Sequence, residues 1–187
     1  MGYVESRKGQ LLIASGRLLD PNFARSVVLI VQHDEDGVLG VILNRPSQVP
    51  VAAVLESWAD VVADPEVLFH GGPVSTDGAL AVAVLADPED EPVGWRATYG
   101  AVGLIDLDSP VELIDGSVRA MRVFAGYAGW GAEQLVEEIA EGSWYVVASE
   151  LDDVFRADVE DLRRQVLRRQ PGELAWVSTR PADPLMN

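Results

Sequence analysis

The chain contains no cysteine, only two histidines and a single lysine among its 187 residues. The absence of cysteine excludes a disulfide framework, a zinc–thiolate site and a thiol nucleophile. Long apolar runs are also missing. The first apolar run, Leu11–Ala14, is too short for the core of a signal peptide and far below the roughly 20 residues of a membrane-spanning helix. We therefore expect a cytoplasmic protein without a membrane segment.

Positive charge is scarce as well. Fourteen basic residues stand against thirty acidic ones, which gives a formal net charge of −16. Such a charge repels phosphate backbones, so direct nucleic-acid binding is disfavoured. Hydrophobic residues make up 48% of the chain, which supplies a core and excludes a wholly disordered protein. The length predicts a single domain over residues 1–187, with residues 1–8 and 180–187 as mobile ends.

Short runs rich in valine and isoleucine predict a β-sheet. The runs 26–33 and 38–43 flank the acidic turn 34–37, and this arrangement is typical of a hairpin. Asn44-Arg45-Pro46 ends the second run. Further apolar runs predict strands at 67–70, 80–85, 101–107, 121–127 and 144–148. Because several of these runs are apolar throughout, we expect both faces of the sheet to be covered.

Three segments have the spacing of helices. The first begins at Pro50 and extends to about Asp60. The clearest helix, 132–141, carries one apolar face, formed by Ala132, Leu135, Val136, Ile139 and Ala140. The last helix covers 158–169, with acids near its start and arginines near its end, and Pro171-Gly172 terminates it. Together with the strands, these helices predict an α/β (α+β) fold, a single compact domain with a large mixed, partly antiparallel sheet flanked by helices.

The two histidines are the first candidates for chemistry. His33 precedes Asp34-Glu35-Asp36, and imidazole with carboxylates could hold a divalent cation. These residues are not spaced like the ligands of an EF-hand loop, so a solvated turn is the main interpretation. We predict that the protein binds no metal and no cofactor. His70 precedes Gly71-Gly72-Pro73, where a structural turn is favoured over a ligand or a catalytic base.

Two further segments could bind anions. The glycine-rich segment 126–131 runs from a strand into a helix, whose free N–H groups can face an anion. Its spacing is not that of a dinucleotide-binding loop, and a glycine turn with Trp130 packed on the core is the main interpretation. The last helix carries a basic cluster that is either ion-paired on the surface or a patch for a phosphate or an acidic partner. Its members are Arg163, Arg164, Arg168 and Arg169.

Several segments of the chain form a recognisable set. They are 9–14, 19–28, 37–46, 70–74 and 126–130, followed by Gln134-Leu135 and Trp144. In this order they resemble the YqgE/AlgH family of bacterial proteins, and the resemblance runs from about residue 9 to residue 147. Two positions depart from the family pattern. Relatives tend to have proline near Gly16, and many have glutamate where Val136 stands.

The resemblance implies a bacterial, cytosolic, single-domain protein with a mixed α/β fold and no established enzyme activity. Some members carry the label of transcriptional regulator. The family has no agreed catalytic residues, so the resemblance supplies only motif positions. They are Asp20, Phe23, Arg25, Ser26, His33, Asn44, Pro46, Gly71, Gly72, Pro73, Gly129, Trp130, Gln134 and Glu138.

We hypothesise a non-enzymatic regulatory or accessory protein that binds a protein partner or a small ligand, because no nucleophile elbow, P-loop or zinc-protease motif occurs. The candidate binding residues are Arg25, Ser26, His33, Asn44, Gly71, Gly72, Gly129, Trp130 and Gln134. Five of them would line one cleft if the hairpin lies beside the turns after 67–70 and 121–127. They are Arg25, His33, Asn44, Trp130 and Gln134.

Two alternatives belong to other classes. The first is a hydrolase-type enzyme that uses His33 or His70 with nearby carboxylates. The second is a transcriptional regulator that binds DNA through the Arg163–Arg169 helix, which predicts a steep dependence on salt.

Overall fold

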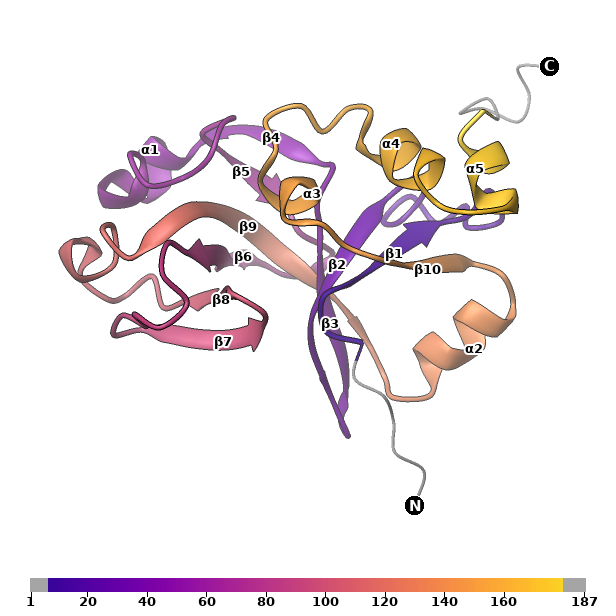
Figure 1. Cartoon of the computed structure of the whole chain (residues 1–187), viewed down its shortest axis with the longest axis horizontal. Helices are drawn as coiled ribbons and strands as arrows, with labels where there is room; N and C mark the ends of the chain where they lie inside the picture. The colour runs from indigo at the N-terminus through magenta and orange to yellow at the C-terminus, as the bar shows by residue number, and fades with distance from the viewer. Residues whose placement is uncertain (1–6, 180–187) are drawn as a thin grey trace.

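A computed structural model describes residues 7–179 of the chain. Its strands lie in one curled sheet of ten strands, with β10-β1-β2-β3-β9-β6-β8-β7 as the main path and β4 and β5 beside it (Figure 1). The strands are β1 (Gln10–Ala14), β2 (Val27–Asp34), β3 (Gly37–Ile42), β4 (Pro46–Pro50), β5 (Val67–His70), β6 (Val74–Leu85), β7 (Trp95–Tyr99), β8 (Val102–Ile105), β9 (Val118–Trp130) and β10 (Trp144–Ala148).

Strand β9 joins the two parts of this sheet. Its end pairs with β3, where Val38 lies opposite Trp130, and its earlier part pairs with β6, where Val82 lies opposite Arg122. All of these pairings are antiparallel, whereas β5 pairs with β9 in parallel. The structure therefore confirms the α+β fold and the mixed, partly antiparallel sheet.

Helices cover both faces of the sheet. They are α1 (Val51–Val54), α2 (Gln134–Ala140), α3 (Leu151–Phe155), α4 (Leu162–Arg168) and α5 (Glu173–Val177), with 3₁₀ turns at Glu56–Trp58 and Val111–Leu113. Figure 1 shows α3, α4 and α5 on one side of β1 and β10, and α2 on the other. Within the described residues, no helix is long and apolar enough to cross a membrane.

The core consists of three clusters because side chains alternate along each strand. On β1, Leu11 and Ile13 pack into the largest cluster together with residues of α4, whereas Leu12 and Ala14 face the cluster beneath α2. The third cluster holds Trp58 against β6 and β9. The expectation of a sheet covered on both faces is confirmed.

The structure corrects several element boundaries. It adds strands β1, β4 and β7 and helices α3 and α5, which the sequence did not predict. The predicted helix 50–60 is the short α1 followed by a 3₁₀ turn, and the predicted helix 158–169 is reduced to α4. Of the predicted mobile ends 1–8 and 180–187, residues 1–6 and 180–187 lie outside the described residues. The backbone N–H of Arg7 donates to Nδ1 of His33.

The predicted apolar face of α2 is also wrong in part. Leu135 is buried and Ile139 is partly buried, as that face requires, but Val136 is 57% exposed. Ala132 and Ala140 are exposed as well. Only one edge of the predicted face contacts the sheet, so the helix lies over it at an angle that leaves Val136 beside open space.

A buried arginine holds the middle of the molecule together. Arg122 on β9 is 1% exposed, and its guanidinium lies 4.3 Å from the centre of the Phe69 ring. Its Nη1 donates to the carbonyl oxygens of Val154 at 2.9 Å and Arg156 at 3.0 Å, and its Nη2 donates to that of Asp64. Burial lowers the pKa of Arg122 to about 10. One side chain therefore joins β9, β5, the loop before β5 and the end of α3.

We predict that Arg122→Met lowers the free energy of unfolding by about 3 kcal/mol or more, because one buried and two partly buried carbonyl groups lose their charged donor. The matched control is Arg119→Met on the same strand, where the side chain is exposed and the expected change stays below about 0.5 kcal/mol. Urea unfolding of both variants measures the difference. Equal stability losses in the two variants would contradict a central role for Arg122.

Candidate functional site

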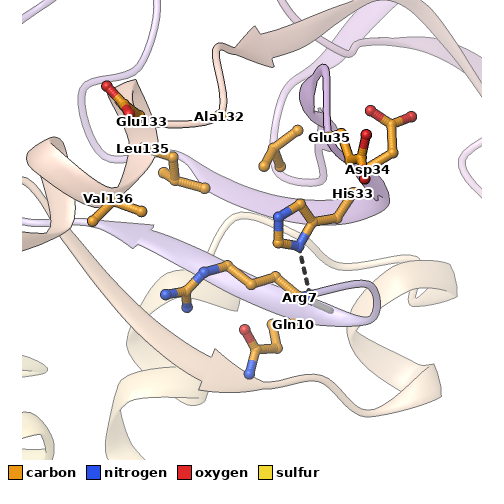
Figure 2. Close-up of a pocket in the computed structure, with 10 residues that line it drawn as sticks. Arg7, Gln10, His33, Asp34, Glu35, Ala132, Glu133, Leu135 and Val136 are labelled. Carbon is orange, nitrogen blue, oxygen red and sulfur yellow. Dashed lines mark hydrogen bonds between the residues drawn. The ribbon is translucent and has the colours of Figure 1, made fainter. Parts of the chain in front are cut away.

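A cavity of about 670 Å³ lies between the β2–β3 turn and the start of α2 (Figure 2). Three half-buried polar side chains line its inner part, namely Arg7, Gln10 and His33. Val38 and Leu135 form an apolar wall, which Val136 extends towards the solvent. At the mouth, exposed residues complete the lining, and they are Asp34, Glu35, Ala132 and Glu133.

A β-bulge turns His33 towards this cavity. The register of β2 and β3 shifts between Ile30 and Gln32, so that His33 lies opposite Val38. Residues opposite each other in antiparallel strands share one face of the sheet, and Val38 belongs to the cluster beneath α2. Without the extra residue in β2, strict alternation from Ile30 would place His33 on the other face.

The backbone of the N-terminal segment fixes the state of the His33 ring. The N–H of Arg7 donates to Nδ1 of His33 at 3.0 Å. Since Nδ1 is an acceptor, a neutral ring carries its proton on Nε2. Figure 2 shows this second nitrogen facing the space between α2 and the Arg7 side chain. His33 therefore offers the cavity a hydrogen-bond donor.

Two more polar side chains that line the cavity lack a hydrogen-bond or ion-pair partner within the described residues. The Oε1 atom of Gln10 is buried and has no hydrogen-bond partner in the described structure. Among the ion pairs of residues 7–179, none includes Arg7. A buried acceptor without a partner is costly.

The mouth of the cavity carries negative charge. A hydrogen bond from the Gln32 side chain, and then one from the Asp36 N–H, keep the pKa of Asp34 below its usual value. Asp34 therefore stays ionised at neutral pH, beside the exposed Glu35 and Glu133. The cavity thus combines donors inside with carboxylates outside.

The lining of the cavity can be compared with the groups that catalysis and metal binding commonly use. They include no hydroxyl or thiol that could serve as a nucleophile next to His33. In the described part of the chain, no group of three or more His, Asp or Glu side chains has a geometry that could hold a metal ion. The carboxylates after His33 form a solvated turn, in which Asp34 accepts the N–H of Asp36 at 2.9 Å.

Trp130 and Gln134 lie near the cavity but serve the structure around it. Trp130 is 5% exposed, and its ring lies 5.8 Å from those of Phe23 and Trp144. This placement agrees with the interpretation that Trp130 packs on the core. The Oε1 of Gln134 accepts the N–H of Gly131 at 3.3 Å and so closes the turn before α2.

Three predicted site residues gather at the opposite end of the β2–β3 hairpin. Asn44 accepts the N–H of Val27 at 3.0 Å and donates to the carbonyl of Arg25 at 3.0 Å. Ser26 is fully buried, and its hydroxyl has no hydrogen-bond partner in the described structure. Since β2 runs from this end to His33, the hypothesis of one cleft that includes Arg25, His33 and Asn44 is wrong.

The predicted glycines divide into two kinds. A Cβ on Gly72 would overlap the carbonyl group of Tyr127, and one on Gly71 would overlap the carbonyl oxygen of Gly126. These two glycines allow the chain after β5 to pack directly against the backbone of β9. At Gly129, by contrast, the nearest atom to an added Cβ is 3.8 Å away, which is an ordinary contact.

The other histidine and the basic helix lie apart from the cavity. His70 is exposed at the end of β5, where its N–H donates to the Arg45 carbonyl at 2.8 Å. On α4, Arg163 donates to the carbonyl of Ala14 at 2.7 Å, and just after the helix Arg169 pairs with the buried carboxylate of Asp153. Two of the four arginines in the predicted basic cluster therefore stabilise the fold.

Sequence reasoning missed Arg7 and Gln10. Neither lies in a motif with recognisable chemistry, and both reach the cavity only because β1 lies between β2 and β10. The one available signal was the place of Gln10 in the first segment of the family resemblance.

The curled sheet and its covering helices define a known class of α+β protein. A family model described as AlgH-like matches residues 11–175, and the chain belongs to this family. Among curated proteins, a UPF0301 protein from Streptomyces coelicolor is 55% identical over 190 residues, which cover 100% of this chain and 98% of the relative. A UPF0301 protein from Mycobacterium tuberculosis is 46% identical over 180 residues, or 95% of this chain and 89% of the relative.

Solved structures share the fold. A crystal structure of a protein from Corynebacterium diphtheriae matches with a TM-score of 0.87 and 33% identity, over 96% of this chain and 95% of that one. The solution structure of the AlgH protein from Pseudomonas aeruginosa matches with a TM-score of 0.71 and 24% identity, over 97% of each chain. The names of these relatives state no biochemical activity.

We predict that Gly72→Ala and Gly129→Ala have opposite outcomes. The first places a methyl group inside the Tyr127 carbonyl and should cost about 3 kcal/mol or more, because the backbone there cannot yield cheaply. The second meets no atom closer than 3.8 Å and should change stability by less than about 1 kcal/mol. Thermal unfolding of both variants measures the difference, and a stable Gly72→Ala protein would contradict the close packing of the two backbones.

Proposed function

We propose that this protein is a non-catalytic regulatory or accessory protein that binds a small zwitterion with an apolar body in the cavity beside His33. An apolar α-amino acid or a short peptide has this chemistry. The observation that carries the proposal is the order of chemistry along the cavity, with donors inside, an apolar wall, and carboxylates at the mouth. The proposal keeps the cytosolic location that the family resemblance implies.

The inner end of the cavity suits a carboxylate. Arg7 contributes a positive charge, and His33 contributes the N–H of Nε2. Hydrogen bonds between charged groups are about twice as strong as neutral ones, so a carboxylate gains more here than a carbonyl does. The unpaired Oε1 of Gln10 can accept an N–H from the same ligand.

The outer part suits a cation and an apolar chain. Glu35 and Glu133 are exposed, and exposed charges contribute less than about 1 kcal/mol each, so they orient a ligand more than they hold it. Val38, Leu135 and Val136 offer an apolar surface for a branched side chain. A volume of about 670 Å³ lies within the range of cavities that bind small molecules.

Two features favour binding over the alternatives from the sequence. A neutral His33 with Nδ1 occupied by Arg7 presents a donor to the cavity, so it does not act there as a general base. Arg163 donates to the carbonyl oxygen of Ala14, and Arg169 forms an ion pair with Asp153. These contacts leave fewer free guanidinium groups for DNA on the last helix. Both features support a ligand-binding protein.

We predict that leucine binds with higher affinity than either of its blocked forms. Leucinamide lacks the carboxylate that Arg7 and His33 would contact, and N-acetyl-leucine lacks the cation that faces the acidic mouth. Isothermal titration of the full chain with leucine, leucyl-leucine and these two analogues measures the order. Equal affinity for the zwitterions and the blocked forms, or no binding of any of them, would refute the proposal.

Variants locate the binding site. Arg7→Gln should weaken leucine binding about 10-fold or more, because it removes a charged hydrogen bond of about 1.5–3 kcal/mol, and should change leucinamide binding little. Val136→Trp should block the mouth, since Val136 is 57% exposed and lines the cavity. Arg119→Gln and Val93→Trp are the matched controls on exposed positions outside the lining, and both should bind as the wild type does.

A further inference from the structure

One hydrogen bond ties the N-terminal segment to the wall of the cavity beside His33. The structure describes the chain from Arg7 onward, and the Arg7 side chain lines the cavity. The backbone N–H of Arg7 donates to Nδ1 of His33 at 3.0 Å, as the dashed line in Figure 2 shows. The two residues lie 26 positions apart in the sequence, so this bond joins the N-terminal segment to strand β2.

Other contacts hold the chain from Gly9 onward. The N–H of Gly9 donates to the carbonyl oxygen of Ile30 at 2.8 Å, and β1 then pairs with its two neighbouring strands. The other backbone contact of Arg7 is local, because its carbonyl oxygen accepts the N–H of Gln10 at 3.0 Å. Its side chain takes part in none of the ion pairs of residues 7–179. In this part of the chain, the position of Arg7 therefore depends on His33.

The bond from Arg7 requires a neutral His33 ring. A neutral imidazole has one nitrogen that accepts a hydrogen bond, whereas both nitrogens of the protonated ring carry a hydrogen and donate. Two N–H groups that face each other repel, so a proton on Nδ1 turns this attractive contact into a repulsive one. Histidine is also the side chain that ordinarily changes its charge between about pH 5 and pH 8. The contact is thus sensitive to protonation in a range that no other side chain of the cavity lining covers.

Carboxylates around His33 stabilise the protonated ring. Asp34 and Glu35 follow it on the hairpin turn, and Glu133 lines the same cavity from the start of α2. Side-chain and backbone hydrogen bonds lower the pKa of Asp34, so it stays ionised while a histidine titrates. The positive charge of Arg7 opposes protonation, and the other lining residues from β1, β3 and α2 carry no charge. Two states therefore compete, one with the Arg7 bond and one with the carboxylates.

We propose that the bond between Arg7 and His33 is a latch that holds Arg7 in the cavity wall while His33 is neutral and releases it when His33 gains a proton. The residues from Gly9 onward stay on the sheet in both states, because their hydrogen bonds do not involve the ring. Release removes the one arginine or lysine among the described lining residues and opens the cavity on that side. The latch acts on the cavity of the proposed function but does not depend on what that cavity binds.

The test is an NMR titration of the full, ligand-free chain between about pH 8 and pH 5. The chain has only two histidines, so the ring signals of His33 and His70 can be assigned separately. We expect the amide signal of Arg7 to shift with the same midpoint as the ring signals of His33. The protection of this amide against hydrogen exchange should fall about fivefold or more, because one hydrogen bond is lost.

Three variants assign the effect to the His33 ring. His33→Asn keeps an acceptor near the place of Nδ1 but does not titrate, so the Arg7 amide should stay protected throughout. His33→Phe has no acceptor, and the Arg7 amide should be unprotected at every pH. His70→Asn is the matched control, because His70 is exposed and lies outside the cavity lining. In this control, the Arg7 amide should titrate as it does in the wild type.

Any one of three results would overturn the proposal. The first is an Arg7 amide that stays protected in the wild type after the His33 ring is protonated. The second is a titration of the Arg7 amide that persists in His33→Asn, and the third is a protected Arg7 amide in His33→Phe. None of these measurements uses a ligand, so a failure of the latch can be distinguished from a failure of leucine binding.

Discussion

The buried guanidinium of Arg122 is the constraint on which the rest of the structure depends. A cation with 1% exposure that forms no ion pair within the described residues must be satisfied by carbonyl groups, and here they come from the loop before β5 and from the end of α3. Those contacts fix the chain on both sides of β9. Strand β9 in turn pairs with β3 at its far end. Strand β3 pairs with β2, where Val38 lies opposite His33 beside the cavity. A polar group in the core thus sets the position of a surface site.

The β2–β3 hairpin separates predicted site residues at its two ends. The β2–β3 hairpin presents His33 at its turn and the Arg25 loop at its open end, and the two ends differ in charge. The bulge between Ile30 and Gln32 decides the candidate site, because it brings His33 to the face beneath α2. Asn44 holds the open end of the hairpin, because its amide bridges the backbone on both sides of Ser26. Both features are local departures from a regular hairpin, which is where binding residues commonly lie.

The sequence predicted the parts of this fold whose signals are local. The β2–β3 hairpin and helix α2 follow from apolar spacing and turn residues, and both are confirmed. Strands β4 and β7 were missed because they carry exposed or proline-flanked residues and no apolar run. The face of His33 could not be predicted, since simple alternation places it on the wrong side of the sheet. The partners Arg7 and Gln10 depend on pairing between distant strands, which spacing along the chain does not encode.

The place of β1 in the sheet has a consequence for synthesis of the chain. Gln10 pairs with Ala148, 138 residues further along the chain, so the N-terminal strand lacks one of its two neighbours until the ribosome has released residue 148. Pairing at such separation closes a long loop and slows folding. During this time the open edge of β1 is available to other chains as they emerge. The nascent protein therefore exposes this edge until late in translation, and a chaperone that covers its first strand would protect it from aggregation during that time.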